Sequence, residues 1–155
     1  MSKRRKTIYT SWSMPDPATN YVPLPKGIYR IGLTGEEISI YGYLFSLENE
    51  NYQCWPSYKT IGGAVSLSRR TVVRYIAMLE EERLIRVEHT EVIRKDGLKY
   101  NGTLRYTIRP FRDAEDYYNR QQMVKLEQDT EKWRIQKELE RRGVEFTPAR
   151  DGQSA

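Results

Sequence analysis

The strongest constraint on the fold is a pair of helices predicted between residues 57 and 83 with only a tight turn between them. Ser57 is a typical N-cap residue and opens a short helix with the sequence YKTIGGAV. The letters SLS then form the turn, and Ser68 caps a longer helix that runs to about Arg83. A glycine inside so short a helix costs about 1 kcal/mol relative to alanine, so a packing reason is expected. We expect Gly62 to let another helix backbone approach closely.

The charges at the two ends of this longer helix are reversed from the usual arrangement. Arg69 and Arg70 stand in its first turn, where exposed backbone N–H groups attract anions. Each such arginine costs about 0.3–1 kcal/mol against the helix dipole. The far end carries Glu80-Glu81-Glu82, where cations would be favoured. A phosphate group beside the first turn would make the positive charge an attraction, so this turn is expected to contact an anionic partner.

The same helix is predicted to have two distinct faces. Its apolar residues recur at helical spacing, as Val72, Ile76 and Leu79, and are expected to face the core. The residues on the second, basic face are Arg70, Val73, Arg74 and Ala77.

An earlier helix and a short extended segment precede this pair. The letters TGEE form a capping box of Thr34 and Glu37, and apolar residues follow at helical spacing to about Glu48. The letters QCWP predict an extended piece, because the residue before a proline avoids helical dihedrals. Tyr41 and Trp55 are expected to lie in the core rather than to stack on bases.

A β-hairpin is predicted between residues 84 and 110. Asp96-Gly97 is the strongest short hairpin signal in the chain and marks the turn. Asn101-Gly102 predicts a bulge or a loosened region in the return strand. The basic residues near the tip are Arg94, Lys95 and Lys99.

The two ends of the chain differ from its middle. The first residues are basic, and MPDPATNYVPLP has four prolines in twelve residues, which disfavours regular structure. Asp113 is expected to cap a long helix that runs to about Arg142 and stops at Gly143. Its apolar residues keep no clean heptad, so a coiled coil is not indicated. The predicted parts are an arm (1–26), a domain (27–112), a helix (113–142) and a disordered tail (143–155).

The charge distribution favours a polyanionic partner. The formal net charge is +5, and residues 1–112 hold 18 Lys/Arg against 11 Asp/Glu, whereas the remainder holds 8 against 10. A merely soluble basic protein would have the same charge. With one cysteine, Cys54, and one histidine, His89, an internal disulfide and the usual Cys/His zinc site are excluded. His89 is expected to be structural or exposed.

Three quoted segments also resemble a known family. CWPSYKTIGGAVSLSRRTVVRYIAMLEEERLI resembles winged helix-turn-helix domains in small proteins of bacterial mobile elements (conjugative transposons, plasmids and phages), which are related to replication-initiator N-terminal domains. YVPLPKGIYRIGLTGEEISIYGYL and RKDGLKYNGTLRYTIRP are similar to versions on conjugative transposons. The resemblance covers roughly residues 21–112 and departs at Ser66, where the family turn usually has glycine, so a left-handed backbone there would be strained. It implies a mainly α fold with a small β-hairpin wing (α+β), followed by a long C-terminal helix.

The resemblance implies binding to duplex DNA, and the residues suggest how. Arginine reads guanine through two hydrogen bonds and valine contacts a thymine methyl, so the expected base-reading residues are Arg69, Arg70, Val73 and Arg74. The expected contacts to the DNA backbone are Ser57, Tyr58, Lys59, Ser68 and Thr71. Further contacts are expected from the wing residues Arg94, Lys95 and Lys99 and from the arm residues Lys3, Arg4, Arg5 and Lys6. The alternative interpretation of all these basic residues is ordinary solvated surface charge.

The sequence therefore favours a sequence-specific, double-stranded DNA-binding protein that regulates transcription of a mobile genetic element. The alternatives are a plasmid or transposon replication or maintenance factor, and a winged-helix adaptor that binds proteins. The 113–142 helix is a candidate for a homodimer contact or a protein partner. Neither an enzyme nor a cofactor or metal site is expected, because there is no Gly-rich phosphate loop and no nucleophile–base set. Without a signal peptide or transmembrane run, a cytoplasmic, nucleoid-associated location is expected.

Overall fold

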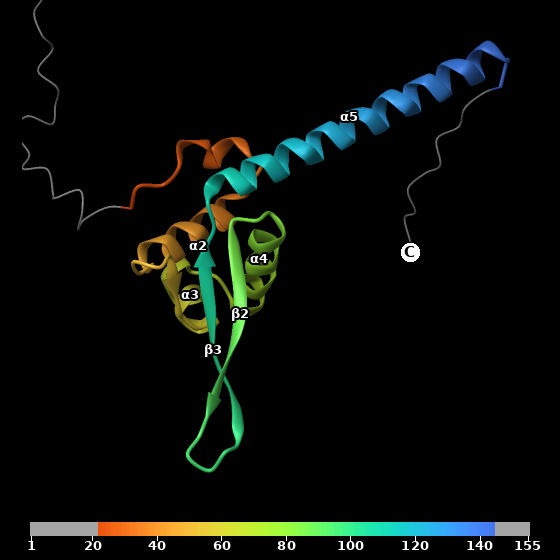
Figure 1. Ribbon diagram of the computed structural model, residues 1–155. Coiled ribbons are helices and arrows are strands. Elements are labelled where there is room, and N and C mark those ends of the chain that lie inside the picture. Colours follow the sequence, from red (N-terminus) through yellow and green to blue (C-terminus); the bar gives the residue numbers. More distant parts are fainter. Residues whose placement is uncertain (1–21, 145–155) are drawn as a thin grey trace, which may run out of the picture.

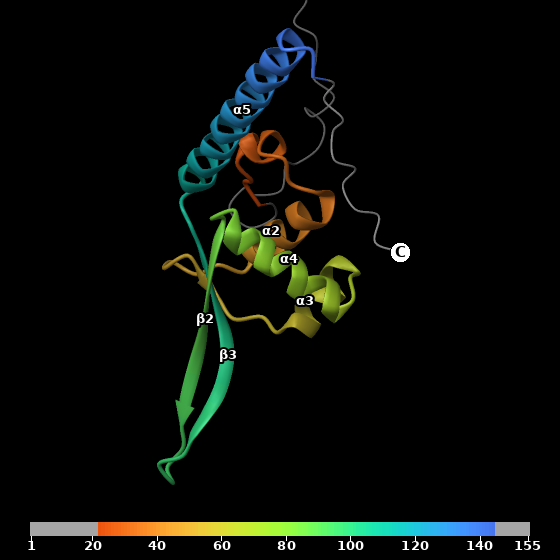
Figure 2. The ribbon, with the colours of Figure 1, turned by 90° about the vertical axis from the view of Figure 1, so that its right-hand side faces the viewer.

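The computed structural model describes residues 22–144 of the 155-residue chain. Its elements, in order, are η2 (Lys26–Arg30), α2 (Gly35–Ser46), β1 (Gln53–Cys54), α3 (Tyr58–Val65), α4 (Arg69–Glu81), β2 (Ile85–Ile93), β3 (Lys99–Ile108) and α5 (Phe111–Arg141). The helices α2, α3 and α4 pack against one another on one face of an antiparallel sheet with the strand order β1-β3-β2 (Figure 1). Figure 2 shows that α5 and the β2–β3 hairpin extend from this body in opposite directions. The arm residues Lys3, Arg4, Arg5 and Lys6 and most of the expected tail lie outside the described residues.

The three predicted caps begin three helices at the expected positions. The Thr34 hydroxyl accepts the Glu37 N–H at 3.3 Å, and the Glu37 carboxylate accepts the Thr34 N–H at 2.6 Å, which confirms the capping box of α2. Ser57 caps α3 and Ser68 caps α4, each accepting a backbone N–H in the first turn. The ends were predicted less well, since α2 stops at Ser46 and α4 at Glu81, each two residues early.

The core lies between these helices and the sheet. The predicted core face of α4 is confirmed, because Val72 and Leu79 are fully buried and Ile76 nearly so. Tyr41 is buried as predicted, but the prediction for Trp55 is wrong, since 44% of this residue is exposed. Side chains alternate along an extended segment, so the buried Cys54 directs its neighbour Trp55 outward.

The sequence analysis also missed η2, which contributes Ile28 to the core. This element is a single short 3-10 turn, and no capping side chain marks its start. A segment this short has no apolar periodicity to read, so only packing against the folded domain defines it.

The hairpin has the predicted turn and the predicted bulge. Gly97 adopts a left-handed conformation (φ 79°), and its N–H donates to the Arg94 carbonyl at 2.9 Å. His89 pairs with Leu104 and Glu91 with Asn101, so one residue of β2 faces two residues of β3. The extra residues are Gly102 and Thr103, opposite Thr90.

The long helix α5 begins earlier than predicted. It starts at Phe111 after Pro110, which provides no side-chain cap, so the prediction of Asp113 as the cap is wrong. Asp113 instead lies in the first turn, where its charge suits the helix dipole and pairs with Arg109 at 3.0 Å. Gly143 (φ 72°) follows the helix end, as predicted. Only the first two turns pack against the domain, because every residue from 119 to 137 is exposed.

Candidate nucleic-acid interface

The N-terminus of α3 presents an anion-binding end to solvent. Ser57 precedes the helix in an extended conformation, and its hydroxyl accepts the Thr60 N–H at 3.1 Å. The other N–H groups of the first turn have no partner within the helix, and no acidic residue stands among them. The Lys59 side chain is exposed beside them. This end of α3 therefore combines backbone donors, the helix dipole and a cation, which together suit a phosphate.

The turn between α3 and α4 fixes how the two helices meet. Ser66 adopts a left-handed conformation (φ 58°, ψ 39°), although a residue with a side chain is strained there. The Leu67 N–H donates to the Gly62 carbonyl at 3.0 Å, which closes the turn. A Cβ at Gly62 would lie 2.5 Å from the Leu67 carbonyl oxygen. The predicted need for glycine is therefore confirmed, but the closely approaching backbone belongs to the turn and not to another helix.

The first turn of α4 holds cations that no acidic side chain among residues 22–144 neutralises. Arg69, Arg70 and Arg74 are all exposed, and none of them forms an ion pair with another residue of the 22–144 segment. The first turn contains no acidic residue. Val73 is 41% exposed on the same side of the helix. A basic, mostly uncovered face with one apolar residue is the arrangement that base reading requires.

The hydroxyl groups predicted for DNA contacts are already engaged in capping. The Ser68 Oγ accepts the Thr71 N–H at 3.2 Å and lies 2.8 Å from the Thr71 Oγ1. Their first effect is to start α4 at the right residue, which sets the direction of the arginines that follow. Contacts of these two hydroxyls to a phosphate remain a prediction.

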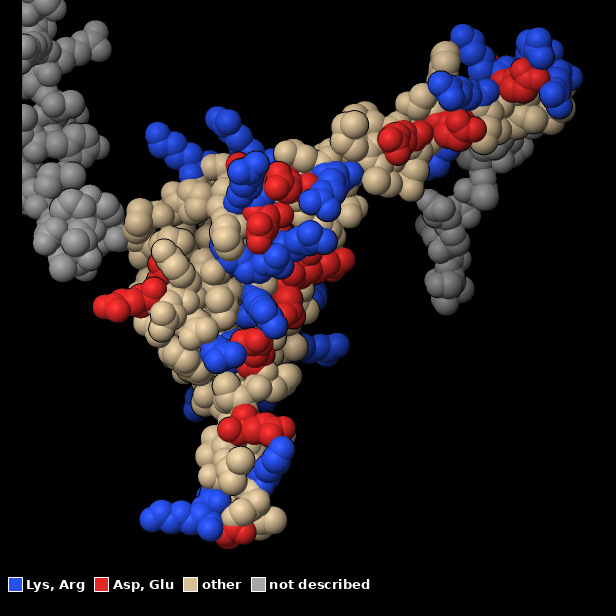
Figure 3. Space-filling model, in the orientation of Figure 1, with Lys and Arg blue, Asp and Glu red and all other residues tan. Residues whose placement is uncertain are grey.

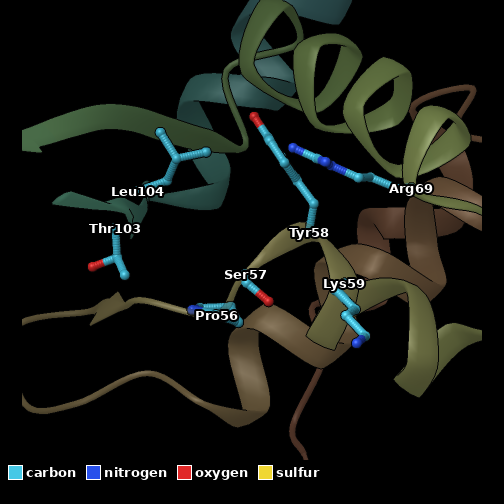
Figure 4. Close-up of a pocket in the computed structure, with 7 residues that line it drawn as sticks. All are labelled: Pro56, Ser57, Tyr58, Lys59, Arg69, Thr103 and Leu104. Atoms are coloured by element: carbon cyan, nitrogen blue, oxygen red, sulfur yellow. The ribbon is translucent and has the colours of Figure 1, made fainter. Parts of the chain in front are cut away.

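A groove brings part of the predicted site together. It has a volume of about 370 Å³ and its lining residues are Pro56, Ser57, Tyr58, Lys59, Arg69, Thr103 and Leu104. In Figure 4 the Arg69 side chain extends across the groove toward the Tyr58 hydroxyl, whereas Lys59 points away from both. The groove thus joins the starts of α3 and α4 to the inner part of β3. A phosphate in it would meet the α3 N-terminus and the Arg69 guanidinium together.

The other predicted residues lie outside this groove. Arg70, Val73 and Arg74 continue along the exposed face of α4. The basic residues near the hairpin tip, which are Arg94, Lys95 and Lys99, are exposed at the far end of β2 and β3. Lys99 forms an ion pair with Glu91 at 3.1 Å, and the Arg94 guanidinium stacks on the Tyr100 ring at 4.7 Å. His89 was expected to be either structural or exposed, and it is exposed.

Sequence reasoning missed the contribution of Pro56, Thr103 and Leu104 to the groove. Thr103 belongs to the bulge that the sequence predicted, but its position beside α3 depends on how the sheet packs. No local pattern carries that information.

The outer face of the sheet has a different character from the α4 surface. Figure 3 shows acidic and basic side chains intermixed over β2 and β3. Glu88 accepts hydrogen bonds from Arg105 and pairs with Arg86 at 3.2 Å. The hydrogen bond and charge of Arg105, together with the charge of Arg86, lower the pKa of the Glu88 carboxyl. This face is neutralised internally and is a poor candidate for a polyanion.

Within residues 22–144, no helix has both the length and the apolar character that crossing a bilayer requires. In the same part of the chain, no group of three or more His, Cys, Asp or Glu side chains is arranged to hold a metal ion.

Three helices joined by a tight turn, followed by a β-hairpin, define the class: the chain contains a winged helix-turn-helix domain, which confirms the predicted fold, followed by a long helix. The wing is the β2–β3 hairpin, residues 85–108. Residues 32–85 match the family model of a helix-turn-helix domain, a match that spans α2, α3 and α4. A comparison with curated proteins finds no match.

The solved structures that are similar to this chain include two transcription regulators. A possible transcriptional regulator from Methanosarcina mazei Go1 has 17% sequence identity and a TM-score of 0.41, over 66% of this chain and 81% of that one. MepR, a transcription regulator of the Staphylococcus aureus multidrug efflux pump MepA, has 14% identity and a TM-score of 0.37, over 72% and 78% of the two chains.

Proposed function

We propose that this protein is a non-catalytic, sequence-specific binder of double-stranded DNA that uses α4 as its recognition helix. The observation that carries the proposal is the set of three exposed guanidinium groups on α4, Arg69, Arg70 and Arg74, without an ion-pair partner among the described residues. The helix-turn-helix match over residues 32–85 supports it independently.

The proposed roles follow from position. Arg70, Val73 and Arg74 read base edges in the major groove, because they lie along the exposed face of α4 beyond its first residue. Arg69 lies between the base-reading face of α4 and the groove that holds the DNA backbone, since it lines the groove shared with the α3 N-terminus. In that groove, Ser57, Tyr58 and Lys59 anchor the phosphate backbone. Outside the groove, Ser68 and Thr71 at the start of α4 also contact the phosphate backbone, and the arm residues Lys3, Arg4, Arg5 and Lys6 add charge.

We further propose that the protein acts in the cytoplasm, at the nucleoid, as a transcriptional regulator of a mobile genetic element. The support is the resemblance of residues 21–112 to proteins of such elements. A replication or maintenance factor would use the same DNA surface, and the genomic positions of the bound sites separate the two roles. Sites that overlap promoters indicate regulation, whereas a cluster at a replication origin indicates replication.

The proposed role of α5 is to hold a partner, either a second copy of this chain or another protein. The largest exposed apolar side chains of the helix are Met123 (59%), Leu126 (62%) and Trp133 (58%). A helix with no tertiary contacts over most of its length is only marginally stable in water, so a partner would stabilise it. This exposed helix is also the observation that favours the adaptor function as the second candidate.

Selection of duplexes from a random library by the full-length protein tests DNA recognition by α4 and pairing of two copies through α5. We expect enrichment of one motif. The logarithm of the binding constant for the enriched duplex should fall linearly with the logarithm of the salt concentration, by about 0.9 for each neutralised phosphate per tenfold increase in salt. If α5 pairs two copies, the enriched sequences should contain two half-sites about one helical turn apart or a multiple of it. Absence of any enrichment, or duplex binding that ignores salt, would contradict DNA recognition and favour the adaptor.

A further inference from the structure

The outer half of the wing is a two-stranded ribbon without support. The third strand, β1, pairs with β3 only at Tyr106 and Thr107, close to the helices. Beyond the bulge, every residue from Glu91 to Asn101 is exposed. Figures 1 and 2 show from two directions that this end of the hairpin projects beyond the helices. A two-stranded hairpin alone in water is only marginally stable, so a wing of this length is expected to be stabilised by a contact with another molecule.

This unsupported tip carries large apolar side chains. The exposed fractions are 52% for Val92, 66% for Ile93, 58% for Leu98 and 43% for Tyr100. Val92 pairs with Tyr100, and the Arg94 N–H donates to the Leu98 carbonyl at 3.1 Å, so Val92, Leu98 and Tyr100 share one face. Ile93 pairs with Lys99 on the other face. Apolar groups therefore protrude on both sides of the tip, where they would be a liability unless a partner covers them.

The charges at the tip indicate which partner that is. Lys99 is balanced by Glu91, but Arg94 and Lys95 form no ion pair with any residue of the described chain. The inner part of the same hairpin lines the groove beside Arg69, so the tip continues the proposed DNA surface. Free cations next to protruding aliphatic side chains are the combination that minor-groove proteins use. The cations hold the backbone, and an apolar side chain wedges between base steps and kinks the duplex.

The dimensions agree with this arrangement. Four residues, 99–102, lie between Thr103 in the groove and Leu98 beside the turn, so these two residues are roughly 17 Å of extended chain apart. Half a turn of B-DNA, the step from a major groove to the next minor groove, is about 17 Å. With α4 in the major groove, the tip of the wing would thus reach the neighbouring minor groove.

We propose that the wing tip bends DNA by inserting apolar side chains, Leu98 and Ile93, into the minor groove next to the site read by α4. This inference rests on the proposed DNA-binding function and adds to it a defined distortion of the bound duplex. Direct contacts of the basic wing residues would hold the backbone on either side of the wedge.

Energy transfer between dyes at the two ends of a 20-base-pair duplex, about 68 Å long when straight, tests the proposal. The probe carries the sequence that the full-length protein enriches from a random library. Saturating wild-type protein should raise the transfer efficiency, because a bent duplex brings its ends together. The variant Ile93→Ser/Leu98→Ser should bind with up to about tenfold weaker affinity and leave the efficiency at saturation near that of free DNA. Both substituted side chains are exposed, and matched circular dichroism spectra check the fold.

Two control variants show whether the bend depends on the apolar side chains of the wedge, on the charges beside them, or on the particular apolar residue. Arg94→Ala/Lys95→Ala should weaken binding but keep the bend once the protein saturates the duplex. Ile93→Met/Leu98→Met keeps apolar bulk and should keep the bend as well. Equal transfer with the serine variant and wild type, or no change with wild type at saturation, would overturn the proposal. Unchanged DNA binding and bending in the serine variant would point to a protein as the partner of the apolar tip. Failure of the wild type to bind any duplex would instead overturn the proposed function.

Discussion

At each end of α4, individual residues lower the stability of the folded domain. At the N-terminus, Arg69 and Arg70 oppose the helix dipole without any ion-pair partner among the described residues. At the other end, Glu82 has one buried carboxylate oxygen that meets no hydrogen-bond partner in the described part of the chain. The proposed DNA contact would explain the first departure, because it places a phosphate beside these arginines. The second lies inside the domain, where the buried Glu82 oxygen lacks a hydrogen-bond donor among the described residues.

Burial is the main cause of the altered acidity of Glu82. It raises the pKa of the carboxyl to about 7, with additional contributions from the nearby carboxylates of Glu37 and Glu81. Glu37 is itself 1% exposed and has an unpartnered buried oxygen. The half-buried Glu82 carboxyl thus lies near the buried Glu37 carboxyl, and the folded state favours a proton on Glu82.

We predict that Glu82→Gln stabilises the protein at alkaline pH. Because the folded pKa lies above the unfolded one, the stability that protonation provides is present at low pH and lost as the pH rises toward 7 and beyond. After allowance for partial exposure, the variant should exceed wild type by about 1 kcal/mol at pH 8, and the difference should shrink toward pH 4.5. Urea unfolding at both pH values measures this. The exposed neighbour substitution Glu81→Gln should show a smaller effect, and a Glu82→Gln advantage that does not depend on pH would contradict the prediction.

At the scale of elements, the turn between α3 and α4 determines how the site is assembled. Gly62 faces the Leu67 carbonyl at a distance that no side chain fits, whereas nothing lies within 4 Å of a Cβ built at Gly63. Both residues belong to α3 and are adjacent in the sequence. The pair therefore offers a matched comparison of crowding against helix propensity.

Gly62→Ala should destabilise the protein by about 1–3 kcal/mol, because the turn must shift to admit the methyl group. Gly63→Ala should instead be neutral or stabilise it by up to about 1 kcal/mol, since alanine favours the helix and meets no neighbour. Thermal unfolding of the two variants measures the difference. Similar stabilities for both would show that the turn does not depend on the close contact at Gly62.

Elements were predictable where a side chain chemically fixes their start. Thr34, Ser57 and Ser68 each accept a backbone N–H, and each marks the true beginning of a helix. The prediction failed where no such bond exists: η2 was missed, and α5 begins after Pro110, which cannot cap through a side chain. Trp55 was misplaced because its exposure follows from the packing of β1 and not from its hydrophobicity.

At the scale of the whole molecule, the domain carries two extensions that point in opposite directions (Figure 2). The wing continues the basic α4 surface, and α5 leads away from it with exposed apolar side chains. This separation suits a molecule in which one end contacts DNA and the other end holds a partner. A contact at α5 would leave the α4 surface free.

The sequence predicted the residue types of the candidate site but only part of its geometry. The reversed charges at Arg69 and Arg70 pointed to α4 because they break a local rule, and such a break can be read without a structure. The groove that joins Arg69 to Thr103 could not be predicted, because the two residues meet only when the sheet packs against the helices. The apolar wing tip was visible as residues, but its lack of support became clear only from the strand pairing.

The central claim is that the exposed arginines of α4 read DNA bases, and one binding measurement tests it most directly. Fluorescence anisotropy compares wild type with Arg70→Ala/Arg74→Ala on the preferred duplex and on a random duplex, with Arg112→Ala/Arg120→Ala on α5 as a control of equal charge. We predict that the α4 variant loses about 10- to 100-fold more affinity for the preferred duplex than for the random one, while the α5 variant discriminates as wild type does. An equal loss on both duplexes would contradict base reading and reduce these arginines to backbone anchors.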